Sequence, residues 1–142
     1  MNATVPVDGE HDGGCLCGYV RYVITERPID AGFCHCRVCQ RSSGAPSIAW
    51  LTVDVAGFAY THGDVAVYRS SERSQREFCP RCGTQIAFRA IADAKTVDVT
   101  ICSLDDSSRV RPEYHIWCES KADWLRIGDE LPQYPDDGPD VT

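Results

Sequence analysis

Apolar and polar residues alternate with a period of two along much of the chain. In the segments 19–25 (YVRYVIT) and 96–101 (TVDVTI), every second residue is apolar. Because successive side chains of a strand point to opposite faces, this pattern predicts β-strands with one buried face. The side chains expected to point inward are those of Val20, Tyr22, Ile24, Val97, Val99 and Ile101.

The same alternation extends to other short segments of the chain. It places Ile86 and Phe88 together on one face of a strand, and it points Asp98 outward from the next. Helical turns are expected only at 36–42 and 103–107, and Gly, Pro, Asp and Ser separate the strands. The predicted fold class is therefore mostly β, a small single domain of antiparallel sheets.

Length and composition are those of one globular domain. The chain has 142 residues, of which 43% are hydrophobic and 25% charged. The domain is expected at 12–135, with a flexible N-terminus at 1–11 and an acidic C-terminal tail at 136–142. No segment reads as a signal peptide or as a membrane span of about 20 apolar residues. A cytoplasmic location is the expectation.

The net charge of −7 limits the partners that this chain can bind. Nucleic acid and anionic membrane surfaces both attract basic proteins, and 14 Lys and Arg against 21 Asp and Glu offer no such excess. The sequence therefore predicts neither partner. It leaves the oligomeric state open.

Nine cysteines are a high number for a chain of this length. An odd number in a reducing compartment argues against a framework of disulfides and for metal ligands. Seven of them form three clusters with the spacings C-x-C, C-x-C-x-x-C and C-x-x-C. Thiolates bind Zn²⁺ strongly, so these clusters predict zinc. The clustered residues are Cys15, Cys17, Cys34, Cys36, Cys39, Cys79 and Cys82.

Two of the clusters end in glycine, which suits the sharp bend that brings paired thiols onto one ion. Gly18 follows the first pair and Gly83 follows the last. We assign these two pairs, Cys15/Cys17 and Cys79/Cys82, to one closed structural site. The middle cluster differs, because a helical turn beginning near Cys36 would aim backbone N–H groups at its thiolates.

The middle cluster, Cys34, Cys36 and Cys39, then holds a second zinc with one open position. Structural sites are saturated by protein ligands, whereas reactive sites keep a place for water or substrate. These three cysteines are therefore the predicted catalytic residues as well as metal ligands. The alternative is a second structural zinc whose fourth ligand comes from the rest of the chain. The candidates for that ligand are Cys102, Cys118, His35, His62 and His115.

The order of these motifs resembles the glutathione-dependent formaldehyde-activating (GFA) family, whose superfamily includes centromere protein V. The resemblance covers about 12–135. The segments that carry it are GGCLCGYVRY, CHCRVCQRSSGAP, YRSSERSQREFCPRCGTQIAFR, VDVTICSLDD, PEYHIWCESKADWL and LPQYP. It implies a β-tent of twisted antiparallel sheets stapled by zinc, and the same division of the cysteines into four and three.

The resemblance also implies a reaction, the condensation of glutathione with formaldehyde to S-hydroxymethylglutathione, classed with the carbon–sulfur lyases. In this hypothesis the zinc of the middle cluster binds a thiol and lowers its pKa, and the thiolate attacks a small carbonyl carbon. The alternatives are a non-catalytic carrier of glutathione or another thiol, and a structural zinc scaffold. An iron–sulfur cluster is less favoured, since the spacings do not match the common ferredoxin runs.

Four further residues are candidates for contact with substrate. Arg41 could pair with a carboxylate of the substrate, and Ser43 could offer a hydroxyl or an N–H group. His115 and Trp117 are two residues apart, so on a strand they would share a face and could line a pocket beside the metal. Three of them have a structural alternative: a solvated charge for Arg41, and packing at a sheet edge for His115 and Trp117.

Overall fold

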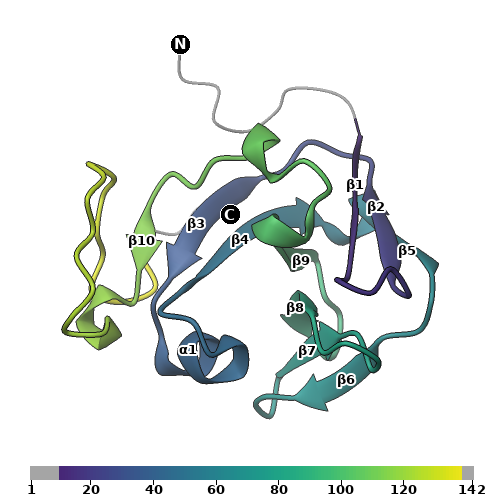
Figure 1. Cartoon of the computed structure of the whole chain (residues 1–142), viewed down its shortest axis with the longest axis horizontal. Helices are drawn as coiled ribbons and strands as arrows, with labels where there is room; N and C mark the ends of the chain where they lie inside the picture. The colour runs from purple at the N-terminus through teal and green to yellow at the C-terminus, as the bar shows by residue number, and fades with distance from the viewer. Residues whose placement is uncertain (1–9, 139–142) are drawn as a thin grey trace.

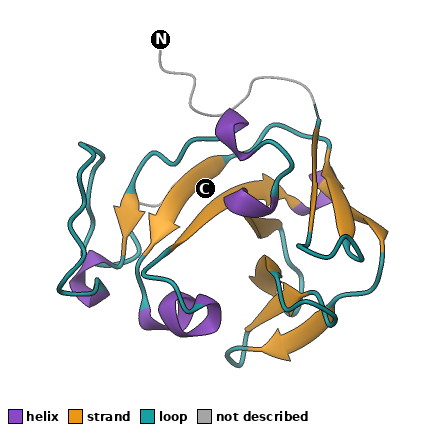
Figure 2. Cartoon of the chain, in the orientation of Figure 1, coloured by secondary structure: helices purple, strands orange, loops and turns teal. Residues whose placement is uncertain are grey.

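The computed structural model describes residues 10–138, which form two β-sheets and one short α-helix (Figures 1 and 2). The smaller sheet has the strand order β1-β2-β5 and the larger the order β10-β3-β4-β9-β8-β7-β6. The strands are β1 (His11–Gly14), β2 (Arg21–Ile24), β3 (Asp30–Cys34), β4 (Ile48–Asp54), β5 (Phe58–His62), β6 (Ala66–Arg69), β7 (Ser74–Phe78), β8 (Gln85–Ala90), β9 (Thr96–Thr100) and β10 (His115–Ile116).

Neighbouring strands pair antiparallel, except that β10 pairs parallel to β3. The predicted mostly β fold is thus confirmed. The helix α1 (Arg37–Ser43) lies where the first helical turn was expected. Short 3₁₀ turns occupy η1 (Val55–Gly57), η2 (Ile101–Ser103), η3 (Ser107–Arg109) and η4 (Cys118–Ser120).

The hydrophobic core lies between the two sheets. All six positions predicted to point inward are at most 3% exposed. Side chains of β2 pack there with those of β4 and β9 from the larger sheet. Burial of this apolar face is the main source of stability for a domain of this size.

The opposite face of the larger sheet turns toward α1, and one expectation about β8 fails there. A bulge in β8 inserts Ile86 between two paired positions, since Glu77 opposes Ala87 while Phe78 opposes Gln85. The extra residue breaks the alternation, so both Ile86 and Ala87 are buried in the core. Phe88 therefore points to the other face, whereas it was expected to lie beside Ile86.

The ends of the described chain are tied to the sheets. Of the predicted flexible segment 1–11, residues 1–9 lie outside the described part, and His11 begins β1 with its side chain buried. Of the predicted tail 136–142, residues 139–142 lie outside it, and the Asp136 carbonyl accepts a hydrogen bond from the Trp117 N–H. Within 10–138, no helix is long and apolar enough to span a membrane.

Candidate metal centres and the cavity beside them

Four cysteines converge where a turn of the smaller sheet meets a turn of the larger one. We call Cys15, Cys17, Cys79 and Cys82 the four-cysteine group. The first pair follows β1 and the second joins β7 to β8. Their sulfur atoms lie within 4.8 Å of one another, with Cys17 Sγ 3.6 Å from Cys15 Sγ and 3.8 Å from Cys79 Sγ.

The backbone around this group holds the thiols in place. Gly18 and Gly83 adopt φ values of 85° and 81°, the left-handed region that their places in the motifs predicted. Thr84 links the two turns, since its hydroxyl accepts from the Leu16 N–H at 3.1 Å and lies 3.2 Å from Cys82 Sγ. Contact with that hydroxyl lowers the pKa of Cys82 to about 5.

Three further cysteines converge at the end of β3 and the start of α1. We call Cys34, Cys36 and Cys39 the three-cysteine group, and its sulfur atoms also lie within 4.8 Å of one another. Cys36 is the N-cap of α1, and its Sγ accepts the Cys39 N–H at 3.3 Å. Contacts with the other two thiols lower the pKa of Cys36 and raise that of Cys34. One thiolate at the helix start is thus favoured, as the sequence predicted.

None of the candidate fourth ligands joins the three-cysteine group within residues 10–138. Cys102 is exposed, and Cys118 forms no part of either group. The His62 ring bonds the Tyr19 carbonyl at 2.7 Å. His35 and His115 bond each other, with His35 Nε2 2.8 Å from His115 Nδ1. The described chain thus offers three possible metal ligands here and four at the other group.

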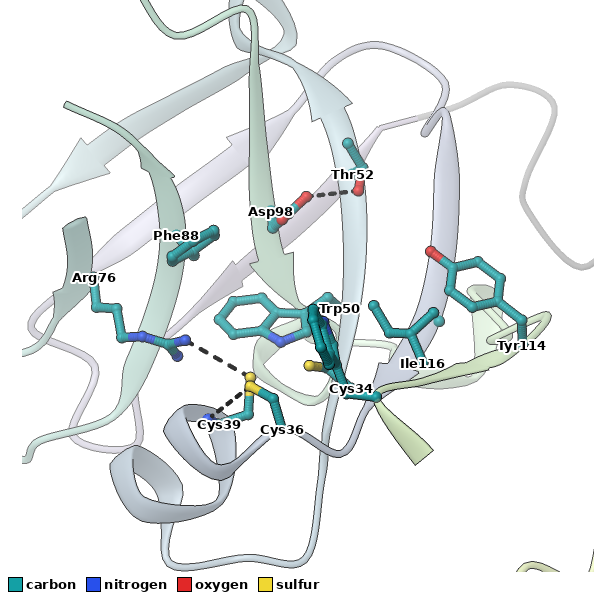
Figure 3. A pocket seen from close by; sticks show the side chains of 12 residues that line it. Cys34, Cys36, Cys39, Trp50, Thr52, Arg76, Phe88, Asp98, Tyr114 and Ile116 are labelled. Atoms are coloured by element: carbon teal, nitrogen blue, oxygen red, sulfur yellow. Dashed lines mark hydrogen bonds between the residues drawn. The ribbon is translucent and has the colours of Figure 1, made fainter. Parts of the chain in front are cut away.

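The three-cysteine group forms one wall of a cavity of about 210 Å³ (Figure 3). A row of directly paired positions crosses the larger sheet and makes the opposite wall. Because paired residues in antiparallel strands share a face, these four side chains line up beside one another. The row runs Arg76, Phe88, Asp98 and Thr52.

Asp98 thus faces the cavity and not open solvent, which corrects the sequence-based expectation. Its Oδ1 accepts a hydrogen bond from the Thr52 hydroxyl at 2.6 Å. Removal from bulk water raises the pKa of Asp98 to about 6. Trp50, Tyr114, Ile116 and Trp117 complete much of the remaining wall. Gly32 has no side chain because a Cβ there would lie 2.3 Å from the Tyr114 ring.

Arg76 carries the positive charge of the cavity. It is only 7% exposed, and its guanidinium lies over the rings of Trp50 and Phe88, 5.7 and 5.0 Å from their centroids. Nη2 donates to Cys39 Sγ at 3.7 Å (Figure 3). Among residues 10–138, no carboxylate pairs with it. A buried charge needs a counter-charge, and the thiolates of the three-cysteine group supply one.

The candidate substrate residues divide between the cavity and other places. Trp117 lines the cavity, although β10 ends at Ile116 and Trp117 adopts a left-handed φ of 57°. The expected shared strand face with His115 is therefore wrong. His115 instead stacks on Phe33 and bonds Asp129, with Nε2 2.9 Å from Oδ2.

Arg41 and Ser43 lie on α1 but do not line the cavity. Arg41 borders a shallow surface hollow with Arg37 and Trp124. The Ser43 hydroxyl donates to the Cys39 carbonyl at 2.7 Å, within the helix. The positive charge expected from Arg41 is supplied at the cavity by Arg76, which comes from a strand distant in sequence.

Comparison with known proteins identifies the family. Residues 10–120 match the family described as glutathione-dependent formaldehyde-activating enzyme, abbreviated GFA. The chain belongs to this family. The resemblance carried by the cysteine motifs is thus confirmed, and the fold and the two cysteine groups are now those of a GFA-family protein.

Relatives and a solved structure agree with this family. A Halomonas elongata protein, provisionally named a glutathione-dependent formaldehyde-activating enzyme, is 28% identical over an alignment of 131 residues that covers 82% of this chain and 80% of that protein. A Schizosaccharomyces pombe protein named an uncharacterized lyase is 30% identical over 81 residues, 56% of this chain and 57% of its own. A Rhodobacter sphaeroides crystal structure shares the fold at a TM-score of 0.56 and 20% identity, covering 66% of this chain and 87% of that one.

The donor atoms of both groups in this GFA-family chain suit a soft metal ion. All seven are cysteine sulfurs, and no carboxylate or imidazole joins either group within the described residues. Clusters of this kind hold Zn²⁺, or iron in iron–sulfur proteins. The structure thus gives two groups that could bind metal ions, consistent with zinc, with four ligands in one and three in the other.

Proposed function

We propose that this GFA-family chain binds zinc in both cysteine groups and joins a small thiol, such as glutathione, to a carbonyl compound. The observation that carries this proposal is the position of the three-cysteine group, whose thiols face a cavity large enough for a small molecule. The four-cysteine group has a full set of ligands, so its role is structural. The family name and the lyase name of one relative support a reaction of this class.

Cys34, Cys36 and Cys39 would hold the ion at the cavity wall. Zinc bound by three thiolates supplies a Lewis acid with room for the thiolate of a substrate as its fourth ligand. In the reaction the S–H bond of the thiol breaks and a C–S bond forms to the carbonyl carbon. The carbonyl π electrons move to oxygen, which takes up a proton, so no oxidant or reductant is required.

Arg76 is suited to stabilise the charge that develops in this reaction. Negative charge grows on the carbonyl oxygen as the C–S bond forms, and a fixed cation in a dry site stabilises it strongly. The guanidinium is held between Trp50 and Phe88 and is directed at Cys39 Sγ. We propose that Arg76 stabilises this developing oxyanion, a different role from the pairing with a substrate carboxylate that the sequence suggested for Arg41, and that Trp117 contacts the substrate.

The test is consumption of formaldehyde by the zinc-loaded protein, with and without glutathione. The proposal expects a glutathione-dependent rate that Cys36→Ser abolishes. The matched control is Cys102→Ser, because Cys102 is exposed and belongs to neither group. Equal rates of formaldehyde consumption with and without glutathione would refute the proposed enzymatic activity. Binding of glutathione without a rate would identify a thiol carrier, the alternative function.

A further inference from the structure

The cavity beside the three-cysteine group is larger than formaldehyde requires. Its volume is about 210 Å³. An apolar protein cavity of about 150 Å³ is enough to bind benzene, whereas formaldehyde has only one carbon and one oxygen. Room for a ring-sized group therefore remains after a one-carbon carbonyl has been placed at the thiols.

The side chains that line this cavity are mostly apolar. Trp50, Phe88, Ile116 and Trp117 all line it. Small-molecule sites commonly have such walls, with a few polar groups that orient the ligand. An apolar body would displace water from these rings, which a formaldehyde molecule is too small to do.

Asp98 provides an orienting polar group in the row opposite the cysteines. One oxygen, Oδ1, accepts the Thr52 hydroxyl. Within residues 10–138 the other oxygen, Oδ2, has no hydrogen-bond partner, and the residue lines the cavity. A carboxylate oxygen in this position can accept a hydrogen bond from a hydroxyl or amine of a ligand.

A thiol as large as a tripeptide does not fit inside this cavity. The cavity is smaller than the range of about 300–1,000 Å³ typical of sites for drug-sized ligands. An open groove lined by Ser70, Ser71 and Ser74 meets the cavity at Arg76 and offers room for the rest of a large thiol. The cavity itself is left for the second reactant.

We propose that the carbonyl substrate of this chain carries a compact, ring-sized apolar group that fills the cavity, with a hydroxyl or amine that donates a hydrogen bond to Asp98. This inference rests on the proposed function and names its substrate class. In the reaction the thiol S–H bond breaks, the C–S bond forms at the aldehyde carbon, and the proton passes to the carbonyl oxygen, as with formaldehyde.

The first test measures binding without any reaction. Phenol, which is unreactive toward thiols, is titrated into zinc-loaded ¹⁵N-labelled protein while the indole N–H signals of the three tryptophans are followed by NMR. Trp50 and Trp117 line the cavity, whereas Trp124 is 72% exposed and lies outside it. We expect saturable shifts of the first two signals and none of the third. Equal shifts of all three, or none, would overturn the proposal.

Two matched substitutions locate the binding. Ile116→Phe adds volume inside the cavity and is expected to abolish the phenol shifts. Ile29→Phe makes the same change at a half-exposed side chain that does not line the cavity, and it is expected to leave them unchanged. Phenol binding that survives in a folded Ile116→Phe protein would contradict a site in this cavity.

A second variant tests the role of Asp98 and does not depend on Ile116→Phe folding. Asp98→Leu is expected to weaken phenol binding about tenfold, the effect of losing one hydrogen bond to a charged group. Toluene, which has a methyl group in place of the hydroxyl, should bind wild type and Asp98→Leu alike. An equal effect of the substitution on both ligands would remove Asp98 from the proposal.

These measurements separate the inference from the proposed function. Phenol binding requires no thiol chemistry, so it can succeed where the formaldehyde assay fails, and the reverse. If both succeed, ring-bearing hydroxyaldehydes should have a lower KM than formaldehyde in the glutathione-dependent reaction. A KM for formaldehyde below that of every larger aldehyde would overturn the substrate class while leaving the reaction intact.

Discussion

At the scale of single residues, the buried guanidinium of Arg76 is the positive charge beside the three-cysteine group. A zinc held by three thiolates carries a net charge of −1, which one arginine balances. Its N–H group contacts Cys39 Sγ, and in the proposed zinc site it would orient that ligand. The charge stays out of bulk water at acceptable cost only while the thiolates are present.

We therefore predict that Arg76→Met weakens zinc binding at the three-cysteine group. Loss of a partner of this kind typically lowers metal affinity or activity 10–100-fold. Chelator competition on the purified protein measures this affinity. Arg73→Met is the control, because Arg73 is exposed and lies just before β7, the strand that contains Arg76. Unchanged zinc retention in Arg76→Met would show that Arg76 does not support the metal site.

Asp98 leads to a prediction about pH. Its pKa is about 6 in the folded protein, above the usual 3.8, so the folded state binds this proton more tightly than the unfolded state does. The contribution of Asp98 to the free energy of unfolding is complete below pH 4 and is lost as the pH rises through 6. It amounts to at most about 3 kcal/mol, from the size of the shift.

Asp98→Asn should remove this dependence on pH, since the amide oxygen can still accept the Thr52 hydroxyl. Urea unfolding of both proteins between pH 4 and 8 measures it. The variant is expected to gain stability relative to wild type as the pH rises through 6. Loss of metal at low pH affects both proteins, so the difference between them isolates Asp98. If the two proteins differ in unfolding free energy by the same amount from pH 4 to 8, the raised pKa of Asp98 is wrong.

Residue by residue, the two cysteine groups and the place of Trp117 at the cavity were predictable, and the rest of the cavity lining was not. Cysteine spacing reports local geometry, so both metal groups could be proposed from the sequence. Arg76, Phe88 and Asp98 come together only through strand pairing across the sheet. Their sequence context resembles that of any exposed or half-buried strand residue, and the pairing register is not encoded in any short segment.

At the scale of elements, the two glycine turns are the features that the sequence specifies best. Gly83 ends the second cysteine pair with φ 81°, and its N–H donates to the Cys79 carbonyl at 2.8 Å. Nothing lies within 4 Å of the position of an added Cβ, so a substitution meets backbone strain alone. An L-residue in this conformation costs roughly 1–2 kcal/mol.

Gly83→Ala should accordingly lower the free energy of unfolding by about 1 kcal/mol. Gly128→Ala is the matched control, because its surroundings are equally open and its φ is not positive. There the alanine should be neutral or slightly stabilising. Chemical denaturation of the zinc-loaded proteins compares them, and equal stabilities would remove the argument from backbone strain.

The strands show where alternation succeeds and where it fails. The pattern at 96–101 was read correctly for the residues that face the core. In β8 one bulged residue moves Phe88 to the cavity face. No feature of the segment TQIAF predicts this bulge. β10 ends after two residues, so Trp117 leaves the strand on which it was expected. Bulges and strand ends depend on partners distant in sequence.

At the scale of the whole molecule, the two cysteine groups connect different parts of the fold. The four-cysteine group brings together the β1–β2 turn of the smaller sheet and the β7–β8 turn of the larger one, more than 60 residues apart in sequence, so a metal ion bound there would cross-link them. The three-cysteine group joins only the end of β3 to the adjacent helix α1. A cross-link restricts the unfolded chain more when the loop that it closes is longer.

Losing a ligand should therefore have unequal consequences in the two groups. Cys82→Ser is expected to release its zinc and unfold the domain, because the two sheets lose their cross-link. Cys36→Ser should release one zinc while the fold persists. Zinc per chain, measured by elemental analysis beside circular dichroism, should fall from two to one in the folded Cys36→Ser protein. If both variants unfold, or if both remain folded with equal stability, the division into a structural and a working metal site is wrong.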